Sequence, residues 1–180
     1  MPFPIVHGVV AASLFIGLQR KLNSFKDWKL VLLSAALSIL PDADFVLDWI
    51  FQLHVHRGFT HSIAFGVAVG LLASVLFGAR KFSHRLALVL APTSHALLDF
   101  LVTNRMGNGI QLLWPLSDYR FRLGLFDYFL FRFDPRVDPW SEISIQVIKI
   151  SLVELIVMGP PFLLLIYLKL RKQNQHSGAV

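Results

Sequence analysis

LPDADFVLDWIFQLHVHRGFTHS, the stretch from Leu40 to Ser62, gathers aspartates and histidines in an otherwise mostly apolar chain. These side chains are Asp42, Asp44, Asp48, His54, His56 and His61. The whole sequence holds only 11 acidic residues and 7 histidines, so this clustering indicates a function. Carboxylates and imidazoles together are the ligand set of a divalent metal ion. The stretch therefore predicts a metal site, to which other parts of the chain should bring further ligands.

The composition indicates a membrane protein. Of the 180 residues, 55% are apolar and only 16% are charged, against about 25% charged in an average soluble domain. The mean hydropathy is +0.61. Cysteine is absent, which excludes disulfides and thiolate metal sites. We expect one membrane-embedded domain over residues 1–172 and a disordered polar tail over 173–180.

Five apolar segments come near the ~20 residues that a spanning helix requires. They cover residues 4–19, 28–40, 61–78, 86–102 and 143–168. The second is short because Pro41 ends it, and Pro160 with Pro161 predicts a kink in the fifth. Thr60 or Ser62 can cap the start of the third segment. The fold class predicted is all-α, a polytopic membrane protein with about five transmembrane helices.

An aromatic-rich segment over residues 103–142 separates the last two apolar segments. Within it, apolar side chains from Leu125 to Phe133 recur at helical spacing and alternate with charged ones. Aromatic residues in such a pattern favour the headgroup region of a bilayer. We therefore expect this segment to lie in the membrane interface.

Basic residues predict the orientation in the membrane. The net charge of +6 comes largely from short clusters that follow the first, third and fifth segments, which is typical of membrane topology and not of a nucleic-acid-binding face. We expect those ends to be cytoplasmic, with the N-terminus outside and the C-terminus inside. The candidate ligands then lie toward the extracytoplasmic ends of their helices. The segment 103–142 carries five arginines, which count against this orientation.

Seven side chains are candidate metal ligands. His95 and Asp99 are four residues apart, so they share one helix face inside an apolar segment, where ionisable groups are costly unless paired or metal-bound. The alternative for this pair is a structural hydrogen bond between helices, and for Asp42 and Asp44 an interfacial turn. The candidates are His7, Asp42, Asp44, His56, His61, His95 and Asp99.

The motifs LPDAD, HRGFTHS, SHALLD and LLWPLSDYRF resemble those of the LexA-regulated, membrane-bound metal-dependent hydrolases, the YdjM-like inner-membrane proteins of bacteria. The resemblance covers most of the chain, from His7 to about Pro139. It implies hydrolase activity, the bacterial inner membrane, and metal-site roles for the same seven residues. The pattern is distantly similar to zinc-dependent phospholipase C and P1-type nucleases, although their further downstream histidines are missing here.

These observations predict a hydrolase that uses one or two divalent ions, with zinc expected and Mn²⁺ or Fe²⁺ as alternatives. Asp42 or Asp44 would act as general base, while Arg57, or Arg120 and Arg122, would neutralise a phosphate. The substrate expected is a phosphoester or a lipid-like molecule reached from the bilayer. The rival functions are a metal- or proton-linked transporter and a non-catalytic membrane protein with a structural metal.

Several other ionisable side chains are left out of the predicted site. His54, Asp48 and Glu154 are weaker candidates for it. His84, inside a basic cluster, and His176, near the C-terminus, are expected to be solvated.

Overall fold

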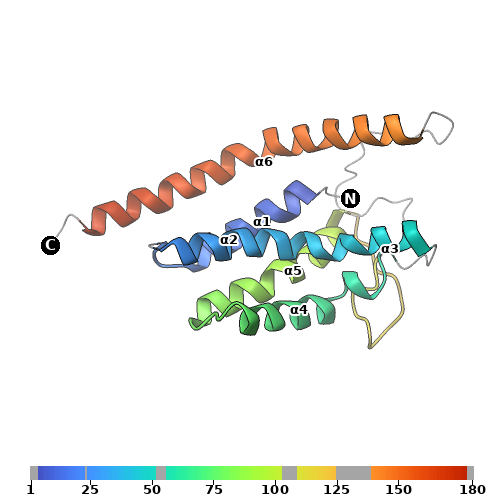
Figure 1. The fold of residues 1–180 in the computed structure, drawn as a ribbon, viewed down its shortest axis with the longest axis horizontal. Helices are drawn as coiled ribbons and strands as arrows, with labels where there is room; N and C mark the ends of the chain where they lie inside the picture. Colours follow the sequence, from blue (N-terminus) through green and yellow to red (C-terminus); the bar gives the residue numbers. More distant parts are fainter. Residues whose placement is uncertain (1–3, 23, 52–55, 103–108, 125–138, 178–180) are drawn as a thin grey trace.

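A computed structural model describes residues 4–22, 24–51, 56–102, 109–124 and 139–177 (Figure 1). In these ranges the chain is helical and contains no strand, apart from an isolated antiparallel bridge between Ile110 and Phe121. The helices are α1 (Pro4–Leu18), α2 (Phe25–Ile39), α3 (Asp44–Phe51), α4 (Ile63–Leu76), α5 (Phe82–Val102) and α6 (Pro139–Ser177). Two 3₁₀ turns, η1 (Leu40–Ala43) and η2 (Phe59–His61), connect them. The predicted all-α class is confirmed.

Local sequence signals set the helix ends. Ser24 and Asp27 form a capping box at the start of α2, and the Ser62 side chain accepts a hydrogen bond from the Phe65 N–H at the start of α4. Pro41 lies at the second position of η1, directly after α2 ends. Ser62 is therefore the cap of the third apolar segment, one of the two residues predicted for this role.

Helix α5 is the centre of the bundle and packs against α1, α2 and α4. The α4–α5 contact is close because α4 carries glycines at the crossing. A Cβ atom at Gly70 would lie 2.4 Å from Val89 Cα, and one at Gly66 would lie 2.8 Å from Thr93 Cα. Small residues allow this approach of two helix backbones, as they do in membrane helix pairs.

Helix α6 lies along the outside of the bundle against α1 (Figure 1). In its apolar part, Ile148–Gln175, only 6% of the most apolar stretch is buried inside the protein, compared with 39% of the corresponding stretch of α5. The helix continues through Pro160 and Pro161, and its axis bends near the middle in Figure 1. It is longer than the predicted segment 143–168 and reaches Ser177, within the stretch 173–180 for which a disordered tail was expected.

Among the described residues, two helices are long and apolar enough to cross a bilayer: α5 and the Ile148–Gln175 part of α6. Helices α1 and α4 are apolar but shorter, with 15 and 14 residues. The segment expected to be the third span is thus shorter than the ~20 residues of an average spanning helix.

The two ends of the bundle differ in chemistry. At one end, Ser83 donates a hydrogen bond to the Gln19 side chain (2.8 Å) and Lys26 Nζ donates to the Gly78 carbonyl (3.1 Å). These contacts join the residue after α1 to the first turn of α5, and the first turn of α2 to the α4–α5 connection, and the basic clusters lie there. An apolar cluster in this half centres on Phe15, Ile16, Leu30 and Leu88. At the opposite end, α1 and α4 begin and α2 and α5 end (Figure 1). This end contains buried histidines and aspartates.

Residues 109–124 cover this polar end. The Gln111 N–H donates to the Arg57 carbonyl (3.2 Å), the Ile63 N–H to the Leu112 carbonyl (3.1 Å) and the Leu123 N–H to the Phe100 carbonyl (2.9 Å). The segment is thus attached both to the turn before α4 and to the end of α5. The helical pattern predicted from Leu125 to Phe133 lies outside the described residues.

Candidate metal centre

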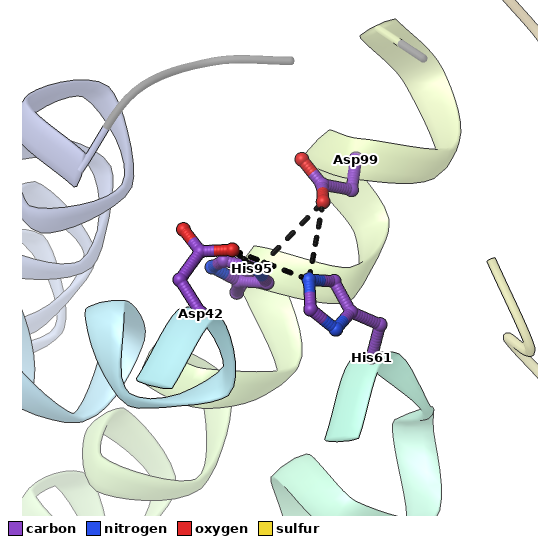
Figure 2. A group of neighbouring side chains, drawn as sticks. All are labelled: Asp42, His61, His95 and Asp99. Carbon is purple, nitrogen blue, oxygen red and sulfur yellow. Dashed lines mark hydrogen bonds and ion pairs between the residues drawn. The ribbon is translucent and has the colours of Figure 1, made fainter. Parts of the chain in front are cut away.

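Four side chains from three parts of the chain converge at the polar end of the bundle (Figure 2). Asp42 comes from η1, His61 from η2, and His95 and Asp99 from consecutive turns of α5. Each offers one donor atom, and these atoms all lie within 4.8 Å of one another. The i, i+4 spacing of His95 and Asp99 places both on the inner face of α5, as the sequence predicts.

The nitrogen–oxygen separations within this group are close to those around a single ion. His61 Nε2 lies 3.3 Å from Asp42 Oδ1 and 3.5 Å from Asp99 Oδ2. His95 Nε2 lies 3.5 Å and 3.7 Å from the same two oxygens. Ligands about 2.0–2.1 Å from a tetrahedral zinc ion are about 3.3 Å apart. The four separations between a histidine nitrogen and a carboxylate oxygen are therefore close to those around a single ion.

The other ring nitrogen of each histidine is already engaged. His95 Nδ1 donates a hydrogen bond to the carbonyl oxygen of Ser38 (2.7 Å), which leaves Nε2 as the ring atom that can bind a metal. His61 Nδ1 lies 3.1 Å from Thr60 Oγ1 and 3.5 Å from Asp44 Oδ2. Metal-binding histidines commonly donate their second nitrogen in this way, which fixes the ring and its tautomer.

Asp44 lies behind His61 and connects it to a second histidine. Its Oδ1 is 2.7 Å from His56 Nδ1, and its Oδ2 accepts a hydrogen bond from the Thr60 hydroxyl. Asp44, His56 and His61 form a second group with donor atoms close enough for an ion. Asp48 Oδ2 accepts a hydrogen bond from the His56 N–H (2.9 Å) and so holds the turn that carries His56. Asp48 thus has a structural contact here.

His7 lies against the first group without belonging to it. Its Nε2 is 3.5 Å from Asp99 Oδ1, and its ring stacks on His95 with centroids 3.9 Å apart. The Ser38 hydroxyl donates to the His7 carbonyl (3.0 Å), which ties α1 to the end of α2. Ser38 therefore contacts both His7 and His95.

The burial of this cluster requires compensating positive charge. The side chains of His7, His61, His95 and Asp99 are fully buried, whereas that of Asp42 is 20% exposed. A buried carboxylate costs several kcal/mol unless it is paired. Among the described residues, neither nitrogen of His7 nor Nε2 of His95 makes a hydrogen bond. A divalent cation would give His95 Nε2 a partner and neutralise the carboxylates, so the donor set fits a metal.

The pKa values of Asp42, Asp44 and His61 reflect the contacts between these side chains. Burial alone would lower the pKa of His61, but hydrogen bonds to Asp42 and Asp44 and the charge of Asp99 raise the pKa to about 9. Burial would raise the pKa values of Asp42 and Asp44, yet their histidine hydrogen bonds hold both pKa values well below the usual range. The aspartates are thus ionised at neutral pH, and without a metal the His61 ring carries a proton.

The seven candidates from the sequence, His7, Asp42, Asp44, His56, His61, His95 and Asp99, all lie in this cluster. Arg57 lies on the adjoining turn with φ of 64°. His54 lies outside the described residues. Glu154 is buried on α6, where it accepts a hydrogen bond from the Val6 N–H (3.3 Å) in the first turn of α1.

The expectation that His84 is solvated is wrong. His84 is buried at the basic end of the bundle, with Nε2 3.4 Å from Asp27 Oδ1 and its ring 5.4 Å from that of Phe15. The first turn of α5 directs it inward toward the first turn of α2, although its sequence neighbours are basic. The side chain of His176 lies outside the described residues.

Two contributors to the site were not predicted from the sequence. Ser38 acts through its backbone carbonyl, which any residue could supply, so no sequence signal identifies it. Thr60 lies within the HRGFTHS motif and was considered only as a helix cap. Its position next to His61 was the available signal.

Comparison with known proteins places this chain in a family. The sequence profile of the YdjM inner membrane protein family matches residues 1–174. The chain belongs to this family. Among its relatives is the inner membrane protein YbcI of Escherichia coli (strain K12), which is 38% identical over 131 residues, 67% of this chain and 72% of YbcI. No solved structure matches the chain. As a YdjM-family protein, the chain is a bacterial inner-membrane protein.

Proposed function

We propose that this YdjM-family protein is a membrane-bound metal-dependent hydrolase that acts on a phosphoester or lipid-borne substrate. The observation that carries the proposal is the convergence of Asp42, His61, His95 and Asp99, with the second nitrogen of each histidine held by another group. A purely structural His–Asp contact would not need four donor atoms with the spacing of one ion.

The residues divide into ligands and supporting groups. Asp42, His61, His95 and Asp99 would hold the ion, and His7 could join them through Nε2. A bound divalent ion supplies Lewis acidity and activates water for attack on an ester. Asp44 orients His61 and keeps a negative charge behind it. Asp44 is also deeply buried, which argues against the role of general base considered from the sequence.

Asp42 lies on the accessible side of the site. It is the one partly exposed member of the four-residue group, so water and substrate would approach beside it. Residues 109–124 lie over this end and carry the exposed apolar side chains of Trp114, Leu116 and Tyr119. Exposed aromatic and apolar groups at this level suit the lipid headgroup region. They support a substrate that arrives from the bilayer. Arg57, next to His56, and Arg120 and Arg122, in the segment 109–124, would neutralise its phosphate.

We further propose five membrane helices, α1, α2, α4, α5 and α6, with the metal centre facing the extracytoplasmic side. All three basic clusters lie at the end of the bundle opposite the site, and positive clusters favour the cytoplasm. Helices α1, α2 and α4, with 15, 15 and 14 residues, are short for a span, and local thinning of the bilayer would accommodate them.

The test is hydrolysis by the detergent-purified full chain loaded separately with Zn²⁺, Mn²⁺ or Fe²⁺, using a chromogenic phosphodiester and phospholipid vesicles. We expect turnover that falls at least about 100-fold in His61→Ala and is retained in His84→Ala, which removes a buried histidine from the opposite end. Metal-loaded protein without hydrolysis would instead support a structural metal. Metal uptake into sealed vesicles would support a carrier.

A further inference from the structure

A second concave site lies at the basic end of the bundle, far from the metal centre. It is a cavity of about 400 Å³ between the end of α1 and the end of α6. Arg20 and Lys21 line it from the α1 side, and Lys169 and Lys172 from α6. Leu18 and Gln173 complete much of the wall.

The four cations of this cavity lack acidic partners in the described part of the chain. Every ion pair between two described residues joins a histidine to an aspartate, and none involves these cations. Lys169 Nζ donates a hydrogen bond to the Gln19 carbonyl, which fixes α6 against the end of α1. Four like charges around one small cavity repel each other, and an anion bound between them would relieve this repulsion.

The surroundings of the cavity favour an amphiphilic anion. On the N-terminal side of Lys169, α6 presents exposed apolar side chains, including Leu163, Leu164 and Tyr167. The cavity thus lies where a membrane-exposed helix surface meets a polar bundle end. Basic pockets between helices at this depth are suited to the headgroups of anionic lipids.

We propose that the cavity between the ends of α1 and α6 binds the phosphate headgroup of an anionic phospholipid, whose acyl chains lie along the apolar face of α6. This site is separate from the metal centre and requires no assumption about the reaction there. The bound lipid would neutralise the cations and hold the peripheral helix α6 against α1.

The test measures lipid binding to the full chain in detergent by native mass spectrometry, with cardiolipin, phosphatidylglycerol or phosphatidylcholine added. We expect the two anionic lipids to be retained and phosphatidylcholine to be lost. Arg20→Gln with Lys172→Gln, one change from each wall, should lower retention roughly tenfold or more. Neither of these two substitutions removes the contact between Lys169 and Gln19.

The matched control is Lys29→Gln with Lys81→Gln, which removes the same charge from exposed positions at the same end but outside the cavity. It should retain the anionic lipids. Equal loss in both double variants would indicate general attraction to a basic surface and overturn the proposal. Protection against thermal unfolding by inorganic phosphate as strong as that by lipid would also overturn it, since the site would then recognise free phosphate. If the cavity double variant unfolds, Lys21→Gln alone should still lower retention, and unchanged retention in it would contradict the proposal.

Discussion

The Nδ1 atom of His95 donates a hydrogen bond to the carbonyl oxygen of Ser38 at 2.7 Å, which connects the centre of the bundle to the last turn of α2. Because a carbonyl can only accept, Nδ1 carries a proton, so in the neutral ring the lone pair is on Nε2, which faces Asp42 and Asp99. One backbone contact between two helices thus sets the tautomer that metal binding needs.

We predict that His95→Ala lowers the metal content of detergent-purified protein, because it removes a donor atom whose orientation is already fixed. The content should fall from about one ion per chain to less than a tenth of that value. Elemental analysis after dialysis measures it. His84→Ala is the matched control, since it also removes a buried histidine paired with an aspartate. Equal metal content in both variants would contradict the assignment.

Asp42→Asn and Asp44→Asn should have different effects. Asp42 faces the donor atoms, so its replacement should abolish tight binding, whereas Asp44 supports His61 from behind. Loss of such a supporting carboxylate typically weakens metal affinity about 10–100-fold. Competition with a fluorescent zinc chelator measures both affinities. The same small change in both variants would mean that the acidic pair forms only a turn.

Metal binding should release a proton at neutral pH. The pKa of His61 is raised to about 9 in the metal-free site, so a metal must displace a proton from this ring below that pH. Apparent affinity should therefore rise about tenfold per pH unit between pH 7 and 9 and level off above pH 9. Calorimetric titration at pH 7.5 in two buffers of different ionisation enthalpy counts the proton. A binding heat independent of the buffer would show that His61 is neutral beforehand.

Gly70→Ala should destabilise the bundle. The added Cβ would lie 2.4 Å from Val89 Cα and 2.6 Å from the Leu88 carbonyl oxygen, so α4 would have to move away from α5. Overpacking of this kind costs about 1–3 kcal/mol. Thermal unfolding in detergent should show a lower Tm. Gly17→Ala is the control: no atom outside its own helix backbone and chain neighbours lies within 4 Å of its added Cβ, and it should leave Tm unchanged or slightly higher.

The proposed orientation can be tested with single cysteines, because the natural chain has none. Leu116→Cys, at the exposed end that carries the metal centre, should react with a membrane-impermeant maleimide in spheroplasts. Lys81→Cys, at the basic end, should react only after the membrane is opened. The reverse pattern would place the metal centre in the cytoplasm and require a substrate from the inner leaflet.

Local sequence patterns determined the membrane class, the helix positions and the set of candidate ligands. Apolar length and charge spacing are local properties, so α1, α2, α4 and α5 begin and end within a few residues of the predicted segments. The motifs LPDAD and HRGFTHS likewise stand out by composition, because buried carboxylates and imidazoles are rare in an apolar chain.

Tertiary structure alone decided how those ligands are arranged. Asp42 and Asp44 are two residues apart and chemically identical, yet η1 directs Asp42 toward the other three donor atoms and leaves Asp44 behind His61. The Ser38 carbonyl and the inward turn of His84 depend on which helix faces which, and a linear sequence does not encode such contacts locally. The orientation of a side chain is set by the packing of whole helices, whereas its identity is fixed by the sequence.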